Sequence, residues 1–332
     1  MNMKKIFVVL MAIVLSVGVA NSAEKKLRIG LLVKNLGNSF FDACRDGALD
    51  AAKELGNVEV IYLGPSTPTA EGQIEMIDAW IAQKVDGIAI SANDKDALVP
   101  ICKKALKKGI KVISFDSGID PAGRLVDLVP SSTEYIGRSQ VKMITEMIGN
   151  EGEIAILSAS SQATNQNAWI EYMKIELKEP EYKNMKLVAT VYGDDLADKS
   201  YREALGLFKT YPNLKGIISP TTVGIAAAGK AIEDSKLKGK VQLTGLGLPS
   251  QMKEYIKNGT CKKMSLWNPI DLGYSAIYIT YKLIKNQATG KPGETIEAGK
   301  MGGIKVGNDG IAVMGAPYVF TSENIEKFAS IY

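Results

Sequence analysis

The side chains of this chain that could do chemistry are suited to holding a small polar molecule rather than to reacting with it. Carboxylates accept hydrogen bonds and amides both donate and accept them, so they can pair each hydroxyl of a sugar, while aromatic rings cover its apolar C–H faces. A site that pairs every hydroxyl rejects analogues that lack one, because its buried polar groups would be left unsatisfied. The candidate ligand-binding residues, which together favour a sugar, are Lys34, Asn38, Phe40, Phe41, Asp94, Asp116, Asn165, Gln166, Pro220, Thr222, Leu246, Trp267 and Asn268.

Some of these candidates also have a purely structural explanation. Asp116 could simply begin a turn, and Lys34 could be solvated or could pair with Asp116 when no ligand is bound. Phe40 and Phe41 are adjacent and cannot face the same side of a helix, so we expect one in the core and the other in a cleft. Trp267 could pack a hinge instead of contacting a ligand.

The composition excludes histidine-dependent catalytic and metal sites, while catalysis by carboxylates, Lys or Tyr stays open. The 332 residues contain no histidine, which rules out a Ser-His-Asp triad, a Cys-His pair and a His-ligated zinc site. A pair of carboxylates acting as a glycoside hydrolase would need carboxyl groups about 5 to 9.5 Å apart, which a sequence does not determine. Because no catalytic signature is present, we expect a protein that is not an enzyme and that carries no cofactor or metal.

The three cysteines, Cys44, Cys102 and Cys261, lie far apart and form no C-x-x-C pair. Free cysteine is among the most buried residue types, so we expect buried free thiols, with a single disulfide as the alternative.

Two further motifs are misleading. The segment 224–230 reads G-x-x-x-x-G-K, but Ala231 follows it where a phosphate-binding loop needs Ser or Thr, so we interpret it as a helix. Asp194, Asp195 and Asp198 lie outside the spacing of a calcium-binding loop, and we expect them to be surface carboxylates.

The net charge is +4, from 40 basic and 36 acidic residues that are scattered along the chain. Nucleic-acid and membrane partners favour clustered Lys and Arg. We therefore expect no nucleic-acid partner, and the charge pattern gives little support for a membrane partner.

Short apolar runs alternate with amphipathic helices after residue 26. We expect strands at 27–33, 58–63, 87–91, 111–116 and 125–129, and in a second series at 153–158, 187–192, 216–219, 242–245 and 263–267. The helices expected between them are 39–55, 69–83, 96–108, 133–148, 167–178, 199–211, 223–235, 250–258 and 269–285. Such runs lack polar alternation, which predicts parallel sheets covered on both faces, so the fold class is α/β with two doubly wound parallel-sheet lobes. Ligands bind beyond the carboxyl ends of such strands, and the candidate residues follow these ends.

The first 23 residues have the pattern of a secretory signal peptide. Lys4 and Lys5 precede an apolar run from residue 6 to 20, and small residues follow up to Ala23. We expect cleavage near Ala23 and a periplasmic location, with an uncleaved anchor helix as the alternative. No later segment is long and apolar enough to span a bilayer, so the mature chain should have no membrane span.

The chain from residue 26 onward resembles the type I periplasmic sugar-binding proteins of ABC transporters. The matching stretches are RIGLLVKNLGNSFF (28–41), SANDKDALVP (91–100), VISFDSG (112–118) and IISPTTVG (217–224). Within that family, ATNQNAWIE (163–171), VYGDDLADKSYREA (191–204), TGLGLPS (244–250) and WNPIDLGYSA (267–276) are most similar to rhamnose-binding proteins. The resemblance implies a monomer that captures L-rhamnose or a similar small sugar and delivers it to a permease with its ATPase.

Receptors for autoinducer-2 are similar as well, and quorum-sensing signal uptake is the alternative function. Their binding pattern is Lys, Asp, Asp-Gln and Pro-x-Ala, which this chain matches at Lys34, Asp116, Gln166 and Pro220. It departs at Asn165, where those receptors usually have Asp, and at Thr222, where they usually have Ala. Asn165 adds a hydrogen-bond donor and Thr222 adds a hydroxyl and bulk, and both changes suit a different sugar.

The same resemblance implies that the chain crosses three times between its lobes. The first lobe would combine 24–129 with 268–299, and the second would combine 130–267 with 300–332. Hinge closure around the ligand would then bury the site.

Overall fold

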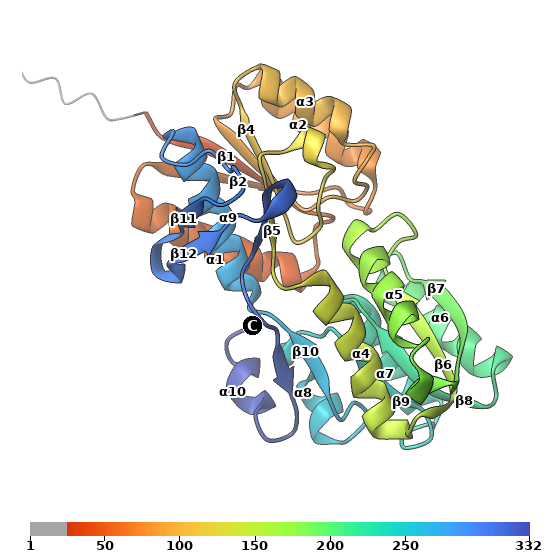
Figure 1. Ribbon diagram of the computed structural model, residues 1–332. Helices are drawn as coiled ribbons and strands as arrows, with labels where there is room; N and C mark the ends of the chain where they lie inside the picture. Colours follow the sequence, from red (N-terminus) through yellow and green to blue (C-terminus); the bar gives the residue numbers. More distant parts are fainter. Residues whose placement is uncertain (1–24) are drawn as a thin grey trace, which may run out of the picture.

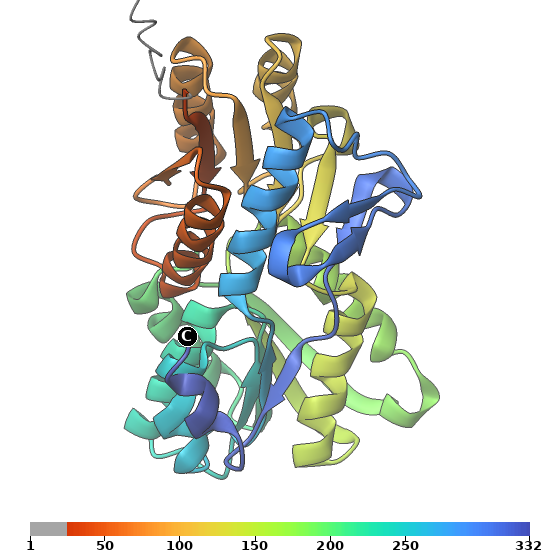
Figure 2. The same cartoon turned by 90° about the vertical axis from the view of Figure 1, so that its left-hand side faces the viewer.

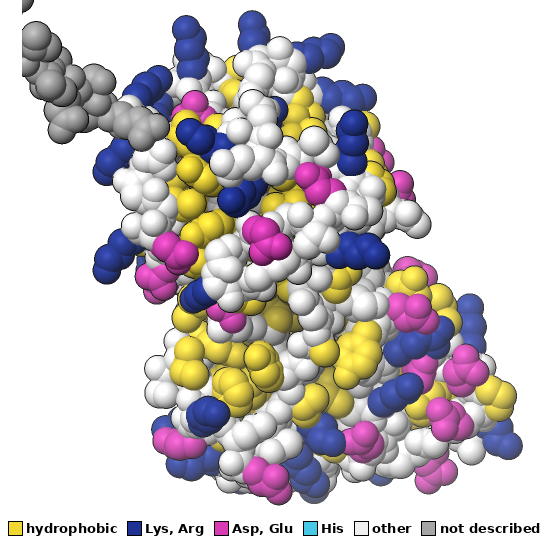
Figure 3. Space-filling view, turned by 60° about the vertical axis from the view of Figure 1, so that its left-hand side comes forward, with side chains coloured by type: hydrophobic (Ala, Val, Ile, Leu, Met, Phe, Trp, Pro, Cys, Tyr) yellow, Lys and Arg dark blue, Asp and Glu magenta, His cyan; other side chains and the backbone are white. Residues whose placement is uncertain are grey.

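The computed structural model describes residues 25–332, which form two α/β lobes joined by a narrow waist (Figures 1 and 3). The predicted signal peptide lies outside the described residues. Among residues 25–332, no helix is long and apolar enough to cross a membrane. The fold class predicted from the sequence is confirmed.

The first lobe is a six-stranded parallel sheet with helices on both faces, in the strand order β13-β5-β4-β3-β1-β2. Its strands are β1 (Leu27–Leu32), β2 (Val58–Leu63), β3 (Gly87–Ile90), β4 (Lys111–Phe115), β5 (Val126–Val129) and β13 (Ile311–Val313). Its helices are α1 (Ser39–Leu55), α2 (Ala70–Ala82), α3 (Val99–Lys107) and α9 (Pro269–Ile284).

The apolar strand runs are explained by burial on both faces. Leu31 packs in the core that includes α1 and α9, whereas the next residue, Leu32, packs in a separate core with Trp80 of α2 and Cys102 of α3. Because successive side chains point to opposite faces, both faces of β1 must be apolar.

Helices α1 and α9 pack with their backbones nearly in contact. A Cβ atom at Gly47 would lie 1.8 Å from the carbonyl oxygen of Ile270, and one at Gly273 would lie 1.8 Å from the carbonyl oxygen of Cys44. This close packing fixes α1, whose first turn reaches the space between the lobes.

The second lobe contains a four-stranded parallel sheet in the order β7-β6-β8-β9. Its strands are β6 (Glu151–Ser158), β7 (Asn184–Tyr192), β8 (Leu214–Ser219) and β9 (Gln242–Gly245), and β10 (Met264–Leu266) pairs antiparallel with β14 (Tyr318–Phe320). Its helices are α4 (Thr133–Ile148), α5 (Thr164–Glu176), α6 (Ala197–Thr210), α7 (Thr222–Asp234), α8 (Pro249–Lys257) and α10 (Ile325–Ala329).

The chain passes between the lobes after β5, after β10 and after β13 (Figure 2). The first and third passages lie side by side, since the amide of Met314 donates to the carbonyl of Val129 at 3.0 Å and that of Gly315 to Pro130 at 3.3 Å. Adjacent extended segments of this kind can bend together, as a hinge requires.

The third passage differs from the one that the resemblance implied. Residues 300–332 were expected in the second lobe, but β13 is an edge strand of the first sheet, paired in parallel with β5. A hairpin of β11 (Thr295–Glu297) and β12 (Gly303–Lys305) leads into it. The chain therefore stays with the first lobe through Val313, because pairing with β5 satisfies backbone groups that would otherwise be left at the sheet edge.

The three cysteines are free and buried, as the sequence predicted.

Candidate ligand-binding site

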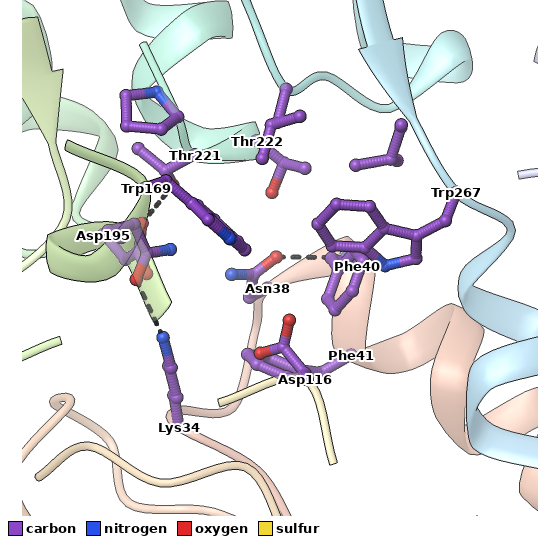
Figure 4. Close-up of a pocket in the computed structure, with 14 residues that line it drawn as sticks. Lys34, Asn38, Phe40, Phe41, Asp116, Trp169, Asp195, Thr221, Thr222 and Trp267 are labelled. Atoms are coloured by element: carbon purple, nitrogen blue, oxygen red, sulfur yellow. Dashed lines mark hydrogen bonds between the residues drawn. The ribbon is translucent and has the colours of Figure 1, made fainter. Parts of the chain in front are cut away.

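A pocket lies between the lobes at the carboxyl ends of the strands of both sheets (Figure 4). It is lined by Lys34, Asn38, Phe40, Phe41, Asp116, Gln166, Trp169, Asp195, Pro220, Thr221, Thr222, Leu246, Leu266 and Trp267. The side chains leave a cavity of about 30 Å³, enough for only a few water molecules. A ligand larger than that requires the lobes to separate or the lining side chains to move.

Lys34 reaches across the pocket from one lobe to the other. It follows β1 and is 3% exposed, and its Nζ donates to Asn165 Oδ1 at 2.8 Å and to Gln166 Oε1 at 3.0 Å. Burial lowers the pKa of Lys34, while the carboxylates of Asp116 and Asp195 act in the opposite direction. Lys34 is thus neither solvated nor simply paired with one aspartate: it links two amides of the second lobe to the first.

Asp116 provides a carboxylate from the first lobe. It follows β4 with a left-handed backbone (φ 60°), and its Oδ2 accepts a hydrogen bond from Ser91 Oγ at 2.7 Å. Burial raises the pKa of Asp116, and Lys34 and the Ser91 hydroxyl oppose that rise. Asp116 does stand in a turn, but this turn also directs its carboxylate into the pocket.

Asp195 provides a second carboxylate, from the second lobe, and the sequence analysis missed it. It was expected on the surface, yet it is 7% exposed and accepts a hydrogen bond from Thr221 Oγ1. Burial raises the pKa of Asp195, and Lys34 and Thr221 oppose that rise. Its position in the loop that follows the carboxyl end of β7 was the signal that could have identified it, since Asp116 likewise follows β4.

Four aromatic rings form one wall of the pocket. The ring of Trp267 lies 6.2 Å from that of Phe40 and 5.8 Å from that of Trp169, with edge-to-face geometry. Phe40 and Phe41 are 5.2 Å apart and both line the pocket, so the expectation that one of them would be purely core is corrected. Adjacent residues can share the pocket because they stand in the first turn of α1, where the chain enters the helix.

The aromatic wall contains a buried donor without a partner. The indole Nε1 of Trp267 makes no hydrogen bond to any described residue. Buried polar groups are normally hydrogen-bonded, so this N–H is available to a ligand. Trp169, on α5, was not among the predicted residues, although it lies in the 163–171 stretch that carried the family resemblance.

Amides beneath the pocket hold the Lys34 backbone in place. The side-chain Nδ2 of Asn93 donates to the carbonyl of Lys34 at 2.9 Å, and the backbone amide of Asn93 donates to Gln73 Oε1 at 2.9 Å. Gln73 Nε2 in turn donates to the carbonyl of Val33 at 3.0 Å. Both amide side chains are buried, so they fix where the lysine leaves the strand.

Three predicted residues lie outside the pocket. Asn165 stands behind it, accepting from Lys34 and donating through Nδ2 to Asp116 Oδ1 at 3.3 Å. Asp94 caps the turn before α3, because its Oδ1 accepts from the amides of residues 96 and 97 at 2.8 and 2.9 Å. Asn268 caps α9, accepting from the amide of Ile270 at 2.9 Å. The side-chain oxygens of Asp94 and Asn268 are thus hydrogen-bonded to backbone amides of their own segments, and neither residue lines the pocket.

The other predicted residues, Asn38, Gln166, Pro220, Thr222 and Leu246, line the pocket. Asn38 also caps α1, since its Oδ1 accepts from the amide of Phe40 at 3.0 Å. Residues 25–332 hold no cluster of His, Cys, Asp and Glu side chains that could bind a metal.

Comparisons with known proteins agree with the two-lobed fold. A family profile described as "Periplasmic binding protein domain" matches residues 29–288. An ABC transporter solute-binding protein from Clostridium phytofermentas, solved with bound L-rhamnose, is 37% identical, covers 93% of this chain and 99% of its own, and superposes with a TM-score of 0.89.

Two other relatives are more distant. LsrB from Clostridium saccharobutylicum, in complex with AI-2, is 21% identical over 91% of this chain and 99% of its own, with a TM-score of 0.86. The D-ribose/D-allose-binding protein of Pseudomonas aeruginosa is 27% identical over 71% of this chain and 75% of its own.

Proposed function

The chain belongs to the periplasmic binding protein family, as a non-enzymatic solute-binding protein of an ABC sugar transporter, and from this premise we propose that it captures L-rhamnose. The observation that carries the proposal is the composition of the pocket, in which one cation, two carboxylates and two amides face a wall of aromatic rings. The 37% identical relative was solved with L-rhamnose, which supports the same choice.

The two kinds of lining suit the two faces of a deoxy-sugar. Lys34, Asp116, Asp195 and Gln166 can pair ring hydroxyls as donors or acceptors. Leu246, Leu266 and the rings beside them offer an apolar surface for the methyl group that replaces the hydroxymethyl group of an ordinary hexose. A hexose hydroxyl placed against these leucines would lose its water partners without replacement.

Capture would proceed by hinge motion, without making or breaking a bond. The cavity of about 30 Å³ is too small for a monosaccharide, so the lobes would separate at the three passages and close again over the sugar. The closed protein would then deliver its ligand to a permease driven by an ATPase. We place this step in the periplasm and expect a monomer.

A titration with two closely matched sugars tests the proposal. L-rhamnose and L-mannose differ only in that mannose carries a hydroxyl on C6, so the pair isolates the contribution of the apolar surface. We expect L-rhamnose to bind at one site per chain and to stabilise the fold by about 2.7 kcal/mol at 100 times Kd. Tighter binding of L-mannose, D-ribose or D-allose in the same calorimetric titration would reject rhamnose as the ligand.

Autoinducer-2 remains the second candidate because Lys34, Asp116, Gln166 and Pro220, the positions shared with its receptors, all line the pocket. Asn165 separates the two hypotheses, since its Nδ2 donates to Asp116 Oδ1 at 3.3 Å and an aspartate there could not.

The double variant Asn165→Asp, Thr222→Ala provides the test. If the chain is a rhamnose binder, the variant loses rhamnose affinity about tenfold or more through the lost donor. If it is an autoinducer-2 receptor, the wild type binds autoinducer-2 in preference to every sugar and the variant binds it more tightly.

A further inference from the structure

Exposed or half-buried lysines gather at the end of the first lobe that lies farthest from the pocket. Lys25, Lys84, Lys108 and Lys111 line one surface depression around Ile284. Lys107 and Lys285 flank it at the ends of α3 and α9. Figure 3 shows Lys and Arg side chains around this upper end of the molecule. We call these six residues the lysine pole.

The parallel sheet gathers residues that are distant in sequence. Lys25, Lys84 and Lys111 stand at or just before the first residues of β1, β3 and β4, and the amino ends of parallel strands lie at one edge of the sheet. Lys107, Lys108 and Lys285 also stabilise the carboxyl ends of helices, where positive charge is favourable. The other three lysines have no such explanation.

The charge of the lysine pole is not neutralised. None of its six lysines forms an ion pair within the described residues, whereas neighbouring Lys104 pairs with Asp78 at 2.5 Å. The carboxylate in the depression, Asp86, accepts a hydrogen bond from the backbone amide of Arg28 at 2.7 Å. The surface therefore presents several free ammonium groups of one sign.

The corresponding end of the second lobe has no such excess. The amino ends of β6, β7, β8 and β9 form a similar depression, but Glu151 and Glu153 stand there beside Lys186, Lys215 and Lys240. The fold is the same at both ends, so it does not by itself require a basic surface.

We propose that the lysine pole binds the anionic phospholipid surface of a membrane. Juxtamembrane clusters of several lysines bind anionic lipids through summed, salt-sensitive attraction. The described chain begins at Lys25, within this pole, and the preceding sequence carries the apolar run predicted to direct export. Lys25 is therefore the residue of the lysine pole that lies nearest in sequence to the segment predicted to enter the bilayer.

Binding through this pole leaves the sugar pocket accessible. The pole lies at the amino ends of the first sheet and the pocket at its carboxyl ends, so the two sites are on opposite sides of the lobe. The proposal does not depend on which sugar the pocket takes.

Vesicle co-sedimentation of the exported chain tests the proposal. We expect binding to vesicles of phosphatidylcholine with about one-third phosphatidylglycerol, and none to phosphatidylcholine alone, because only the former has a negative surface potential. The triple variant Lys84→Glu, Lys108→Glu, Lys111→Glu should bind these vesicles at least about tenfold more weakly. About 0.5 M salt should abolish it, since the Debye length then falls well below 10 Å.

The matched control is Lys186→Glu, Lys215→Glu, Lys240→Glu, which changes the net charge equally at the other end of the molecule. It should change vesicle binding by less than about threefold. An equal loss in both triple variants, or no binding by the wild type, would overturn the proposal, as would binding to a DNA oligonucleotide without binding to the vesicles. An unchanged thermal shift with the cognate sugar checks that each variant is folded.

Discussion

The two lobes bring the same arrangement to the pocket from opposite sides. Asp116 of the first lobe and Asp195 of the second each follow a strand, have a left-handed backbone (φ 60° and 50°) and accept a hydrogen bond from a hydroxyl, that of Ser91 or of Thr221. The lobes differ in their other contributions. The first supplies Lys34, the one cation among the described residues that line the pocket, and the second supplies Gln166 and Trp169.

This difference determines which groups the proposed closure would bring together. Bringing the lobes together buries two carboxylates with a single ammonium group, which costs energy unless Lys34 or a ligand compensates them. Lys34 hydrogen-bonds to amides of the second lobe, not to its carboxylate, so the oxygens of Asp195 keep acceptor capacity for a ligand. The first lobe therefore supplies the compensating cation, and the second supplies a carboxylate with acceptor capacity for a ligand.

Removing the one cation should have the largest effect. Lys34→Met leaves two buried carboxylates without a counter-charge, and breaking such an arrangement costs about 3 to 5 kcal/mol, or roughly a 100-fold or greater loss of sugar affinity. Calorimetric titration with the sugar measures this loss of affinity. Lys104→Met, which removes an exposed ion pair, serves as the control and should change affinity by less than about twofold. Near-normal affinity in Lys34→Met would show that the charges of the two lobes are not coupled.

The equivalence of the two carboxylates can be tested directly. Asp116→Asn and Asp195→Asn each keep the shape but lose the charge that a sugar hydroxyl would meet, so each should weaken binding by about 1.5 to 3 kcal/mol. Asp94→Asn, outside the pocket, is the matched control and should bind normally. If only one of the two pocket variants loses affinity, the arrangement has the same geometry in both lobes but not the same role.

The helix packing of the two lobes should respond differently to alanine. Gly47→Ala places a methyl group 1.8 Å from a backbone oxygen of α9 and should lower the free energy of unfolding by about 1 to 3 kcal/mol. Gly206→Ala in α6 meets no atom within 4 Å and should raise it by about 0.5 to 1 kcal/mol, because alanine favours a helix. Urea denaturation measures both. A neutral Gly47→Ala would mean that α1 and α9 can separate without loss.

The smallest expected effect is a pH dependence of stability. Because burial raises the pKa of Asp195, the folded chain keeps a proton that the unfolded chain loses near pH 3.8. The contribution of protonated Asp195 to the stability of the fold is fully present below pH 3.8 and is lost as the pH rises through the raised pKa.

Asp195→Asn lacks this titration. Relative to the wild type, it should become more stable as the pH rises, by about 1.4 kcal/mol for each unit by which the pKa is raised. Urea denaturation at several pH values gives this difference, and a difference that does not vary with pH would contradict the burial of a titrating carboxylate.

The strands and helices of both lobes could be predicted because burial on both faces leaves long apolar runs. α1, α4, β2 and β9 have the predicted bounds, and the other main elements differ by a few residues at their ends. The short strands β11 to β14 were not predicted. Each has only three residues, too few to show a periodicity; β13 and β14 form through pairing with distant strands, and β11 and β12 pair with each other in a short hairpin.

The pocket could be predicted in part for a related reason. The rule that ligands bind after parallel strands pointed to Lys34 and Asp116, which line the pocket, but it could not show that Asp94 caps a turn and that Asn268 caps a helix. Asp195 was missed because a hydrophilic Asp-Asp pair in sequence is the usual sign of an exposed turn. Its burial depends on Thr221 and Lys34, which are distant in the chain.

The sequence by itself determined the fold class, the absence of histidine chemistry and the residue types available to a sugar, since these follow from local patterns and composition. The tertiary structure alone decided which of those residues meet. It placed Asp116 and Asp195 beside Lys34 in one pocket. At the opposite end of the first lobe it placed lysines that are scattered in the sequence on one surface, without ion-pair partners among the described residues. The physical reason is the parallel sheet, which aligns all carboxyl ends at one edge and all amino ends at the other, whatever their separation along the chain.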